Sequence, residues 1–379
     1  MRLAYVATSQ IPSRFANTIQ VLNMCHAFST IGWDVTLFVP GRPYRDIKSI
    51  FDNYSLPETF SIKWIMIPNI FGRFRGILMS IAVQSSLHTW IKQSDELSVV
   101  YTRIPWLGLV FPYKNIFFES HYLPDDQKSL KCQAIIKAVK TSIAHGATKA
   151  IFAISEGLLQ RWRAVGIQCV HLLHDATNLE MFKTLSKSDA RCSLSLPLDR
   201  TIVVYAGQLS PSHGSDVILE VAYHLPEILF ILVGGLEKDI TRIRKIITSR
   251  NISNVILIGH IPHKEVPPYL VAADLLIAPY SSRWQYASVA SPLKLFEYMA
   301  AGRPIIASNI PAVSRIIEHG QTGILVPPDD PNALARAIKM LLANPQTCYL
   351  IASAARQKSL NYSWVTRAKT ATEIILSYF

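Results

Sequence analysis

Short apolar runs alternate with amphipathic stretches along almost the whole chain of 379 residues. This alternation is typical of strand–helix units whose strands form buried parallel sheets. We predict strands at residues 3–7, 34–39, 61–67, 98–101, 116–119 and 150–154, and again at 201–206, 228–233, 255–258, 275–278, 304–307 and 323–326. A helix is predicted over residues 18–30, before Gly32, because glycine is favoured just after a helix. The sequence therefore predicts an α/β fold with doubly wound sheets.

The rhythm of strands and helices is interrupted between residues 183 and 198, where Ser and Lys are frequent and Pro197 lies near the end. A chain of this length is expected to form about two domains. We predict a first domain over residues 1–182, a linker over 183–198 and a second domain from residue 199. Ligands of open α/β sheets bind beyond the carboxyl ends of the strands. Two such domains facing each other would therefore share a central cleft.

Composition excludes several classes of protein. Half of the residues are hydrophobic, which argues against disorder. The five cysteines are scattered and form no Cys-x-x-Cys pair, so neither a disulfide framework nor a zinc knuckle is predicted, and we expect a reduced, cytoplasmic chain. Residues 3–6 already read as a buried strand, so no signal peptide is expected. No apolar run reaches the roughly 18 residues of a membrane span.

The net charge and the absence of several sequence motifs limit the possible ligands and reactions further. A formal net charge of +12 favours an anionic partner, which can be a nucleotide, a phosphorylated substrate or an anionic membrane face. We expect no nucleic-acid partner. The sequence has no dinucleotide fingerprint, P-loop or nucleophile elbow. The acidic pairs Asp125–Asp126 and Asp329–Asp330 are better explained as loop caps than as metal ligands, so we expect no metal and no cofactor.

The most informative stretch lies between residues 290 and 308. Ser291 is predicted to cap a helix whose first residue is Pro292. The N–H groups and dipole of this helix end favour an anion. Lys294 in the first turn opposes the dipole and is better explained as a partner for phosphate, whereas Glu297 could accept two ribose hydroxyls. For each residue alone, a capped helix with a surface Lys–Glu pair is the alternative.

The sequence Ser-Pro-Leu-Lys-Leu-Phe-Glu-Tyr-Met-Ala-Ala-Gly-Arg-Pro-Ile at residues 291–305 resembles the nucleotide-sugar motif of retaining glycosyltransferases of family 4, which have the GT-B fold. The similarity covers nearly the whole chain, with further similar stretches at residues 16–28, 32–37, 205–209, 233–235, 258–262 and 320–328. The resemblance implies two Rossmann-like domains around a central cleft, the first for the acceptor and the second, residues 199–360, for the donor. It also implies that a helix within residues 361–379 crosses back to the first domain.

The resemblance assigns the donor site residue by residue. The implied nucleotide-sugar site consists of Gly207, Gln208, His213, His260, Ile261, Ser291, Pro292, Leu293, Lys294 and Glu297. In this assignment Glu297 holds the ribose, the helix start with Lys294 holds the diphosphate, and the base lies against the loop near His260.

His121 follows the strand at 116–119, where the family carries a histidine beside the donor sugar. The resemblance implies a hydrogen bond that orients the sugar and steadies its charge, so His121 and Lys294 are the predicted catalytic residues. Glu119 could orient the imidazole or be buried and paired. A histidine that satisfies a strand-end carbonyl is the alternative for His121.

Four residues at predicted strand ends could approach the donor or the acceptor: Ser13, Arg14, Asn17 and Arg103. A helix N-cap explains Asn17 equally well, and a surface salt bridge explains Arg103.

The sequence departs from the family pattern at three positions. Val289 stands where the first glutamate of a Glu-seven-Glu pair is usual, and Gln208 and His213 stand where Arg and Lys commonly bind the diphosphate. His213 could still donate a hydrogen bond, and would be charged if its pKa were raised. These departures motivate an alternative, a degenerate GT-B protein that binds nucleotide or a partner glycosyltransferase without catalysis. A nucleotide-sugar epimerase is less favoured because Val289 removes a candidate acid.

Two stretches suggest contact with an anionic membrane. Residues 71–82 are basic at one end and apolar beyond it. Residues 127–150 carry lysines but no acid, with Ile136, Val139 and Ile143 as an apolar stripe. An ordinary amphipathic helix with a solvated basic back is the alternative. The predicted function is a retaining glycosyltransferase that moves a sugar to a glycan or lipid-linked acceptor in surface polysaccharide or glycoconjugate synthesis, with the inner membrane face as a further location.

Overall fold

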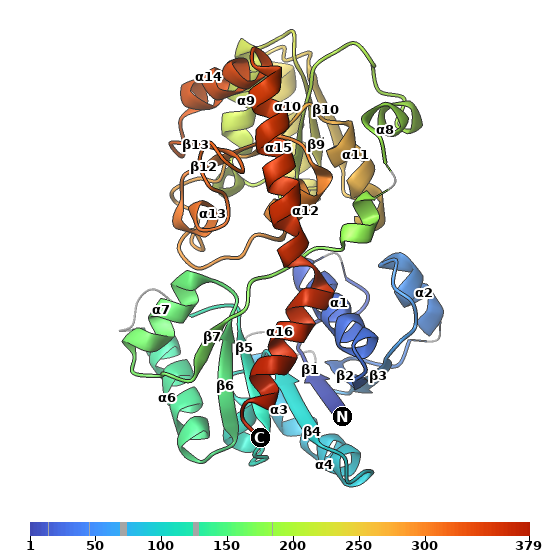
Figure 1. Cartoon of the computed structure of the whole chain (residues 1–379), viewed down its shortest axis with the longest axis vertical. Helices are drawn as coiled ribbons and strands as arrows, with labels where there is room; N and C mark the ends of the chain where they lie inside the picture. The colour runs from blue at the N-terminus through green and yellow to red at the C-terminus, as the bar shows by residue number, and fades with distance from the viewer. Residues whose placement is uncertain (14, 45, 69–73, 124–128, 184) are drawn as a thin grey trace. The chain divides into compact units, whose positions relative to one another are not determined.

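The computed structural model describes residues 1–13, 15–44, 46–68, 74–123, 129–183 and 185–379. These residues form two compact units, each built on its own parallel sheet (Figure 1). Unit 1 contains Met1–Asp175 and Trp364–Phe379, and unit 2 contains Ala176–Ser363. Within the described residues, every helix is too short or too polar to cross a membrane.

Unit 1 has a seven-stranded sheet with the order β3-β2-β1-β4-β5-β6-β7, in which all neighbours are parallel. Its strands are β1 (Arg2–Val6), β2 (Asp34–Pro40), β3 (Ser61–Ile65), β4 (Ser98–Thr102), β5 (Ile116–Ser120), β6 (Thr148–Ala153) and β7 (Val170–Leu172). The chain moves from β1 to one edge and then returns to β4 on the other side of β1. Ligands of doubly wound sheets bind beyond the strand ends at such a reversal.

Helices cover both faces of this sheet. They are α1 (Ala16–Thr30), α2 (Ile47–Asn53), α3 (Arg75–Ala82), α4 (Gln84–Lys92), α5 (Leu107–Val110), α6 (Leu130–Ala144), α7 (Glu156–Ala164) and α16 (Trp364–Leu376). Helices α3, α4 and α5 bury an apolar cluster with β1, β2 and β4. On the opposite face Phe28 of α1 packs against Tyr101 with ring centroids 5.6 Å apart. The indole Nε1 of Trp33 donates to Thr372 Oγ1 of α16 at 3.0 Å, which fixes the C-terminal helix beside α1.

Unit 2 has a six-stranded parallel sheet with the order β10-β9-β8-β11-β12-β13. Its strands are β8 (Ile202–Ala206), β9 (Leu229–Val233), β10 (Val255–Gly259), β11 (Leu275–Ala278), β12 (Ile305–Ser308) and β13 (Ile324–Val326). Its helices are α8 (Lys187–Ser193), α9 (Ser215–His224), α10 (Glu237–Ser249), α11 (Val266–Ala272), α12 (Leu293–Ala301), α13 (Pro311–Ser314), α14 (Pro331–Leu342) and α15 (Pro345–Ser359). Alternate strand residues face α9, α10 and α14 on one side and α11, α12 and α15 on the other.

The predicted strands are all present, with ends that move by no more than two residues. The predicted helix before Gly32 is α1, and Gly32 has φ 96°, which explains the glycine. Strand β7 was not predicted because three residues are too short to show an alternation.

The boundary between the units differs from the sequence prediction. Unit 1 ends at Asp175, and the N–H of Thr177 donates to Tyr362 O at 2.8 Å within unit 2. The expected linker at 183–198 contains α8, which packs on α11. The Ser186 side chain caps α8 by accepting from the Asp189 N–H, so this Ser-rich segment is an N-capped helix of unit 2.

The apolar stripe of α6 is also corrected. Its buried side consists of Cys132, Ile135, Ala138, Val139 and Ser142, which follow the helical period. Ile136 and Ile143 are half-buried. The predicted stripe was therefore one residue out of register at both ends.

Candidate active site

Helix α12 of unit 2 presents Lys294 to an aromatic pair. The helix begins at Leu293 with Pro292 in the N-cap position, so Ser291 does not cap it as predicted. Lys294 Nζ donates to the hydroxyl of Tyr205 at 2.9 Å. The ammonium also lies 4.0 Å from the ring centroid of Tyr205 and 5.1 Å from that of Tyr280, distances at which an aromatic face attracts a cation.

Gly207 makes room for this lysine. It follows β8 with φ 143°, and a Cβ there would lie 2.4 Å from Lys294 Nζ. Gln208 comes next, and its carbonyl accepts a short hydrogen bond from the Tyr205 hydroxyl. Gly207 and Gln208, both predicted for the nucleotide-sugar site, therefore lie near Lys294, and Gln208 contacts Tyr205 through its backbone carbonyl.

Burial weakens the charge of Lys294. Desolvation lowers its pKa from 10.5 to about 7, and the opposite effect of nearby Glu297 is smaller. A nearby anion such as a diphosphate favours the charged form of a lysine and raises its pKa, so the amine of Lys294 would take up a proton when the anion binds. The site is therefore suited to a bound anion.

Lys294 should make the stability of the protein depend on pH. Because its pKa is lower in the folded than in the unfolded state, the unfolded chain binds more protons between about pH 7 and pH 10.5. The free energy of unfolding of the wild type, minus that of Lys294→Met, should therefore rise through this window. Urea unfolding of both proteins across the window measures the difference, and a difference that stays flat or falls would contradict the burial of the charged amine.

Glu297 lies one turn after Lys294 on α12 and is bound by a residue that the sequence did not single out. Its Oε1 lies 2.6 Å from Nε2 of His263, in the 3₁₀ turn His263–Glu265 after β10. Burial lowers the pKa of His263, but the charge and hydrogen bond of Glu297 outweigh this and raise it. A ribose held by Glu297 would therefore share the carboxylate with His263.

His213 does not supply the second cation that its position suggested. Its pKa falls to about 3, first because the ring is buried and second because Lys294 is near. Nδ1 lies 2.8 Å from Ser210 Oγ, and the ring packs 5.3 Å from the Trp284 ring centroid. His213 is therefore a neutral member of an aromatic cluster in which Trp284 stacks on Tyr280 at 4.6 Å.

The remaining predicted donor residues lie at strand ends of unit 2. Ile261 is part of the apolar cluster beside β9 and α11, and His260 follows β10 directly. Val289 is buried, with 1% of its surface exposed, so the position usual for a glutamate holds an apolar core residue.

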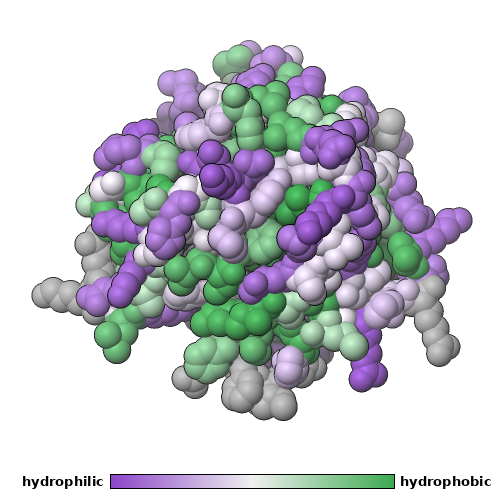
Figure 2. Space-filling view, turned by 90° about the horizontal axis from the view of Figure 1, so that it is seen from below, coloured by the Kyte–Doolittle hydropathy of each residue, from purple (hydrophilic) through white to green (hydrophobic). Residues whose placement is uncertain are grey.

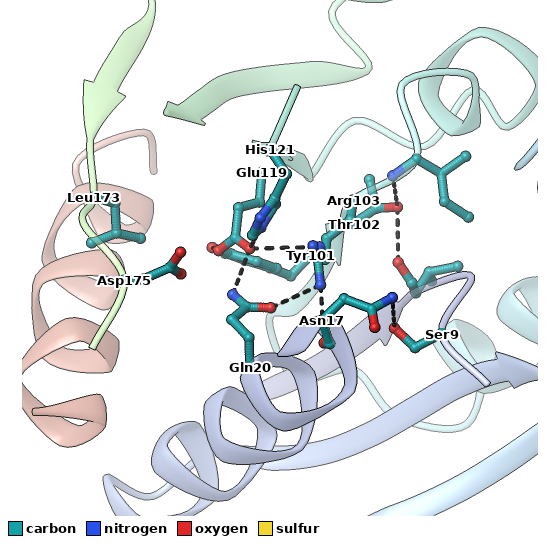
Figure 3. A network of polar contacts seen from close by, with 12 residues as sticks. Ser9, Asn17, Gln20, Tyr101, Thr102, Arg103, Glu119, His121, Leu173 and Asp175 are labelled. Carbon is teal, nitrogen blue, oxygen red and sulfur yellow. Dashed lines mark hydrogen bonds and ion pairs between the residues drawn. The ribbon is translucent and has the colours of Figure 1, made fainter. Parts of the chain in front are cut away.

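In unit 1, His121 lies just beyond the end of β5 and binds Glu119 (Figure 3). The carboxylate of Glu119 is fully buried, and Gln20 Nε2 donates to its Oε1 at 2.7 Å. Tyr101 donates a short hydrogen bond to Oε2. Arg103 Nε lies 3.9 Å from Oε1, on the same side as His121 and Gln20 (Figure 3). The predicted pairing of Glu119 with His121 is present.

Charge and burial act oppositely on this pair. Burial alone would raise the pKa of Glu119, but Arg367, His121 and Arg103 hold it well below the usual range. For His121, burial and Arg103 lower the pKa to about 4 against the opposing effect of Glu119. At neutral pH the pair is therefore a carboxylate and a neutral imidazole.

The first loop and Arg103 are joined by polar contacts. Arg103 Nη1 donates to Asn17 O at 3.1 Å and to Gln20 Oε1 at 3.0 Å, so it is held inside the cluster and not in a surface ion pair. Helix α1 begins at Ala16 after Phe15, so Asn17 is not the N-cap. Ser13 instead bonds Thr18, Oγ to Oγ1, at 2.8 Å. Arg14 lies outside the described residues.

The acidic pair at 329–330 supports loops. Asp330 caps α14 by accepting from the Ala333 N–H at 2.9 Å, and Asp329 accepts from the Ser282 N–H at 2.9 Å, which agrees with the prediction of loop caps. The pair 125–126 lies outside the described residues. In the part of the chain that is described, no three His, Cys, Asp or Glu side chains are grouped as a metal site.

Sequence reasoning missed His263 and Arg367. His263 has no signal beyond its closeness to His260. Arg367 did have a signal, because α16 buries Trp364, Ala368, Ala371 and Ile375 as one stripe and Arg367 lies within it. A charged residue inside an apolar stripe usually has a buried partner.

Comparison with known proteins finds similarity to glycosyltransferases. Residues 200–344 match the family model described as glycosyl transferases group 1. Among curated relatives, D-inositol 3-phosphate glycosyltransferase 1 of Catenulispora acidiphila is 26% identical over 208 residues, which are 52% of this chain and 48% of that protein. The enzyme of Streptomyces scabiei is 27% identical over 63% of this chain and 54% of its own length. The chain spans about half the length of the curated relatives it matches.

Solved structures match over the full length. HepE of Anabaena, in complex with UDP, superimposes with a TM-score of 0.76 at 16% identity over 100% of both chains. Sucrose-phosphate synthase of Thermosynechococcus elongatus gives a TM-score of 0.78 at 20% identity over 99% of this chain and 98% of that one. The prediction of the GT-B fold is confirmed by these structures, which match over nearly the whole chain.

Proposed function

We propose that this protein transfers a sugar from a nucleotide-sugar donor to a hydroxyl of a glycan or lipid-linked acceptor, with retention of configuration at the sugar carbon. The observation that carries the proposal is Lys294, a half-buried lysine in the first turn of α12 whose amine is held against two aromatic rings. Its pKa of about 7 makes it a weak cation until an anion binds. A diphosphate is the anion that a nucleotide-sugar enzyme must hold and release.

Unit 2 is proposed to bind the nucleotide and His121 of unit 1 to contact the sugar. The N–H groups at the start of α12 and the Lys294 ammonium would stabilise the charge that develops on the departing diphosphate. Because the protein supplies this charge itself, we propose that no metal or other cofactor is required. Positioning of donor and acceptor then supplies the rest of the rate enhancement.

The donor is proposed to be a uridine nucleotide. This part of the proposal is supported by HepE, whose structures are described as complexes with UDP and with UDP-glucose. The acceptor is proposed to belong to surface glycan or glycoconjugate synthesis at the inner membrane face. WaaG, a glycosyltransferase involved in lipopolysaccharide biosynthesis, matches with a TM-score of 0.67 at 14% identity. D-inositol 3-phosphate is the competing acceptor, because the curated relatives are named for it.

A thermal-shift panel tests the donor. UDP, GDP, CDP, ADP and their sugars are each added to the protein, and a ligand at about 100 times its Kd should add about 2.7 kcal/mol to the free energy of unfolding. We expect UDP to give the largest shift and uridine to give almost none, because uridine lacks the phosphates that Lys294 would bind. The shifts should be equal with EDTA and with Mg²⁺.

The same panel separates the alternatives. If no nucleotide raises the melting temperature, the donor site is refuted. If UDP binds but no sugar is released or transferred in the presence of glycan acceptors and D-inositol 3-phosphate, the degenerate, non-catalytic GT-B protein becomes the better account. Neutral His213 and buried Val289 are the observations that favour that alternative.

Unit 1 is further proposed to touch an anionic membrane. Leu130 at the start of α6 is 85% exposed, and Ile81 of α3 is 54% exposed. Lys131, Lys137 and Lys140 are exposed on α6. Figure 2 shows apolar residues exposed among hydrophilic ones on the face that it presents. Lys128 and residues 71–73, which the sequence also suggested, lie outside the described residues.

Vesicle sedimentation tests the membrane contact. Each basic residue near an anionic surface contributes about 1 kcal/mol, so replacing three lysines of α6 (Lys131, Lys137, Lys140) with glutamine should reduce binding to phosphatidylserine vesicles about 100-fold or more. Neutral vesicles serve as the control. Equal sedimentation of the wild type with both vesicle types would rule out an electrostatic contact.

A further inference from the structure

The buried carboxylate of Glu119 is surrounded by donors from four separate parts of unit 1. Its Oε1 accepts from Gln20 of α1 and lies within hydrogen-bond distance of Nε2 of His121, and its Oε2 accepts from Tyr101 of β4 and from Nη2 of Arg367 at 2.9 Å. Arg367 belongs to the C-terminal helix α16, more than 240 residues further along the chain. The last helix thus supplies the full positive charge closest to Glu119.

Arg367 is held rigidly. The side chain is 2% exposed, and its Nε donates to His174 O at 2.7 Å. Its Nη2 also reaches Leu173 O at 3.3 Å, and Asp175 Oδ1 lies 3.7 Å away. A guanidinium that donates in several directions can serve a carboxylate and backbone carbonyls at once, which an ammonium cannot do with the same geometry. Arg367 is therefore placed for Glu119 by contacts that do not involve His121.

We propose that Arg367 of α16 is a positioning residue for His121 and acts through Glu119. The proposal rests on the function proposed above, in which His121 contacts the donor sugar. Arg367 keeps Glu119 ionised, so this carboxylate can accept a hydrogen bond but cannot donate one. Nε2 of His121 must then carry the proton that points at Glu119. In a neutral imidazole this leaves Nδ1 as an acceptor, and His121 would accept a hydrogen bond from a hydroxyl of the donor sugar.

The charges around the pair are consistent with this role. The ionisable groups that face Glu119 and His121 are Arg367 on α16, Arg103 after β4, Tyr101 on β4, Tyr5 on β1, Cys25 on α1 and Asp175 after β7. Burial raises the pKa of Tyr5, Tyr101 and Cys25, which are therefore neutral at physiological pH. Two arginines thus oppose two carboxylates. Removing Arg367 leaves an uncompensated negative charge, which one additional proton on the Glu119–His121 pair would neutralise.

The test is a histidine titration that needs no substrate. The protein is labelled with ¹⁵N in its 11 histidine rings, and the signal of His121 is assigned by its loss in His121→Gln. In the wild type at neutral pH we expect a neutral ring with Nδ1 unprotonated and a pKa near 4. In Arg367→Gln we expect the pKa of His121 to rise above its value in the wild type. Glutamine is chosen because its amide can still donate to the carbonyls of Leu173 or His174.

Two further variants separate charge from packing. Arg367→Lys keeps the charge and should return the pKa of His121 most of the way to the wild-type value. Thr372 is on the same helix as Arg367 but carries no charge. Thr372→Val removes the hydrogen bond from Trp33 Nε1 to α16 and should leave the titration of His121 unchanged. If Arg367→Gln does not fold, the proposal is still tested by the tautomer of His121 in the wild type and by the titration of His121 in Arg367→Lys.

The proposal is overturned if the wild-type ring is charged or carries its proton on Nδ1 at neutral pH. It is also overturned if the titration of His121 is the same in Arg367→Gln as in the wild type, or moves equally in Thr372→Val. Because these results are read on the protein without ligand, they are independent of whether a sugar is transferred. A failure of the glycosyltransferase assay with the expected titrations would refute the proposed function and leave the coupling of Arg367 to His121 intact.

Discussion

Replacing Lys294 with methionine should lower kcat for sugar transfer by about 100–1,000-fold, the usual effect of removing one preorganised donor to a developing negative charge. Methionine keeps most of the length of the side chain and can still pack between Tyr205 and Tyr280. The change therefore removes the ammonium without opening a cavity. Transfer is measured with UDP-sugars and the acceptor found in the screen.

The same substitution should stabilise the protein without ligand at neutral pH. Burying the charged amine costs free energy, which is the physical meaning of its lowered pKa. Activity and stability thus move in opposite directions, as happens where a site keeps a strained or desolvated group for function. Lys339→Met is the matched control, because Lys339 is exposed on α14 of the same unit, and it should change neither property. Full activity in Lys294→Met would show that the diphosphate is held elsewhere.

The strands of each sheet could be predicted from sequence because they follow a repeating pattern. Buried parallel strands are continuous apolar runs, so the positions of the strands could be predicted, whereas the order of the strands within each sheet comes from the structure. The prediction of a linker at 183–198 was wrong because the helix in this segment, α8, is short. Its seven residues bury only Ala190 and Arg191. A window that short shows no periodicity, and its composition resembles that of a loop.

The candidate site was predictable where a motif is local in sequence. Lys294 and Glu297 belong to one helix turn, and His121 lies two residues after Glu119. The partners of these residues are not local: Tyr205 is 89 residues from Lys294, and Arg367 is 248 residues from Glu119. Spacing along one strand or helix carries no information about such pairs. The pKa values follow from the partners, so the neutral state of His213 was equally hidden from the sequence.

Two basic residues in the segment that the sequence assigned to a linker should differ sharply in their effect on stability. Arg191 of α8 is 3% exposed and pairs with Asp274 Oδ2 at 2.7 Å. Its other N–H groups donate to four backbone carbonyls, those of Ala272, Pro197, Leu198 and Arg200, at 2.9–3.2 Å. We expect Arg191→Met to lower the free energy of unfolding by about 3–5 kcal/mol, as breaking a buried ion pair does.

Lys183 provides the matched control in the same segment. It also pairs with a carboxylate, that of Glu180, but the two side chains are 60% and 71% exposed. Exposed pairs contribute between 0 and about 1 kcal/mol, so Lys183→Met should have almost no effect in the same urea titration. A similarly small loss in both variants would mean that the segment is a solvated linker, as its composition suggests. A large loss in Arg191→Met alone would mean that its buried arginine fastens the segment to the start of the central strands β8 and β11. There Asp274 also accepts from the Ile202 N–H at 2.8 Å.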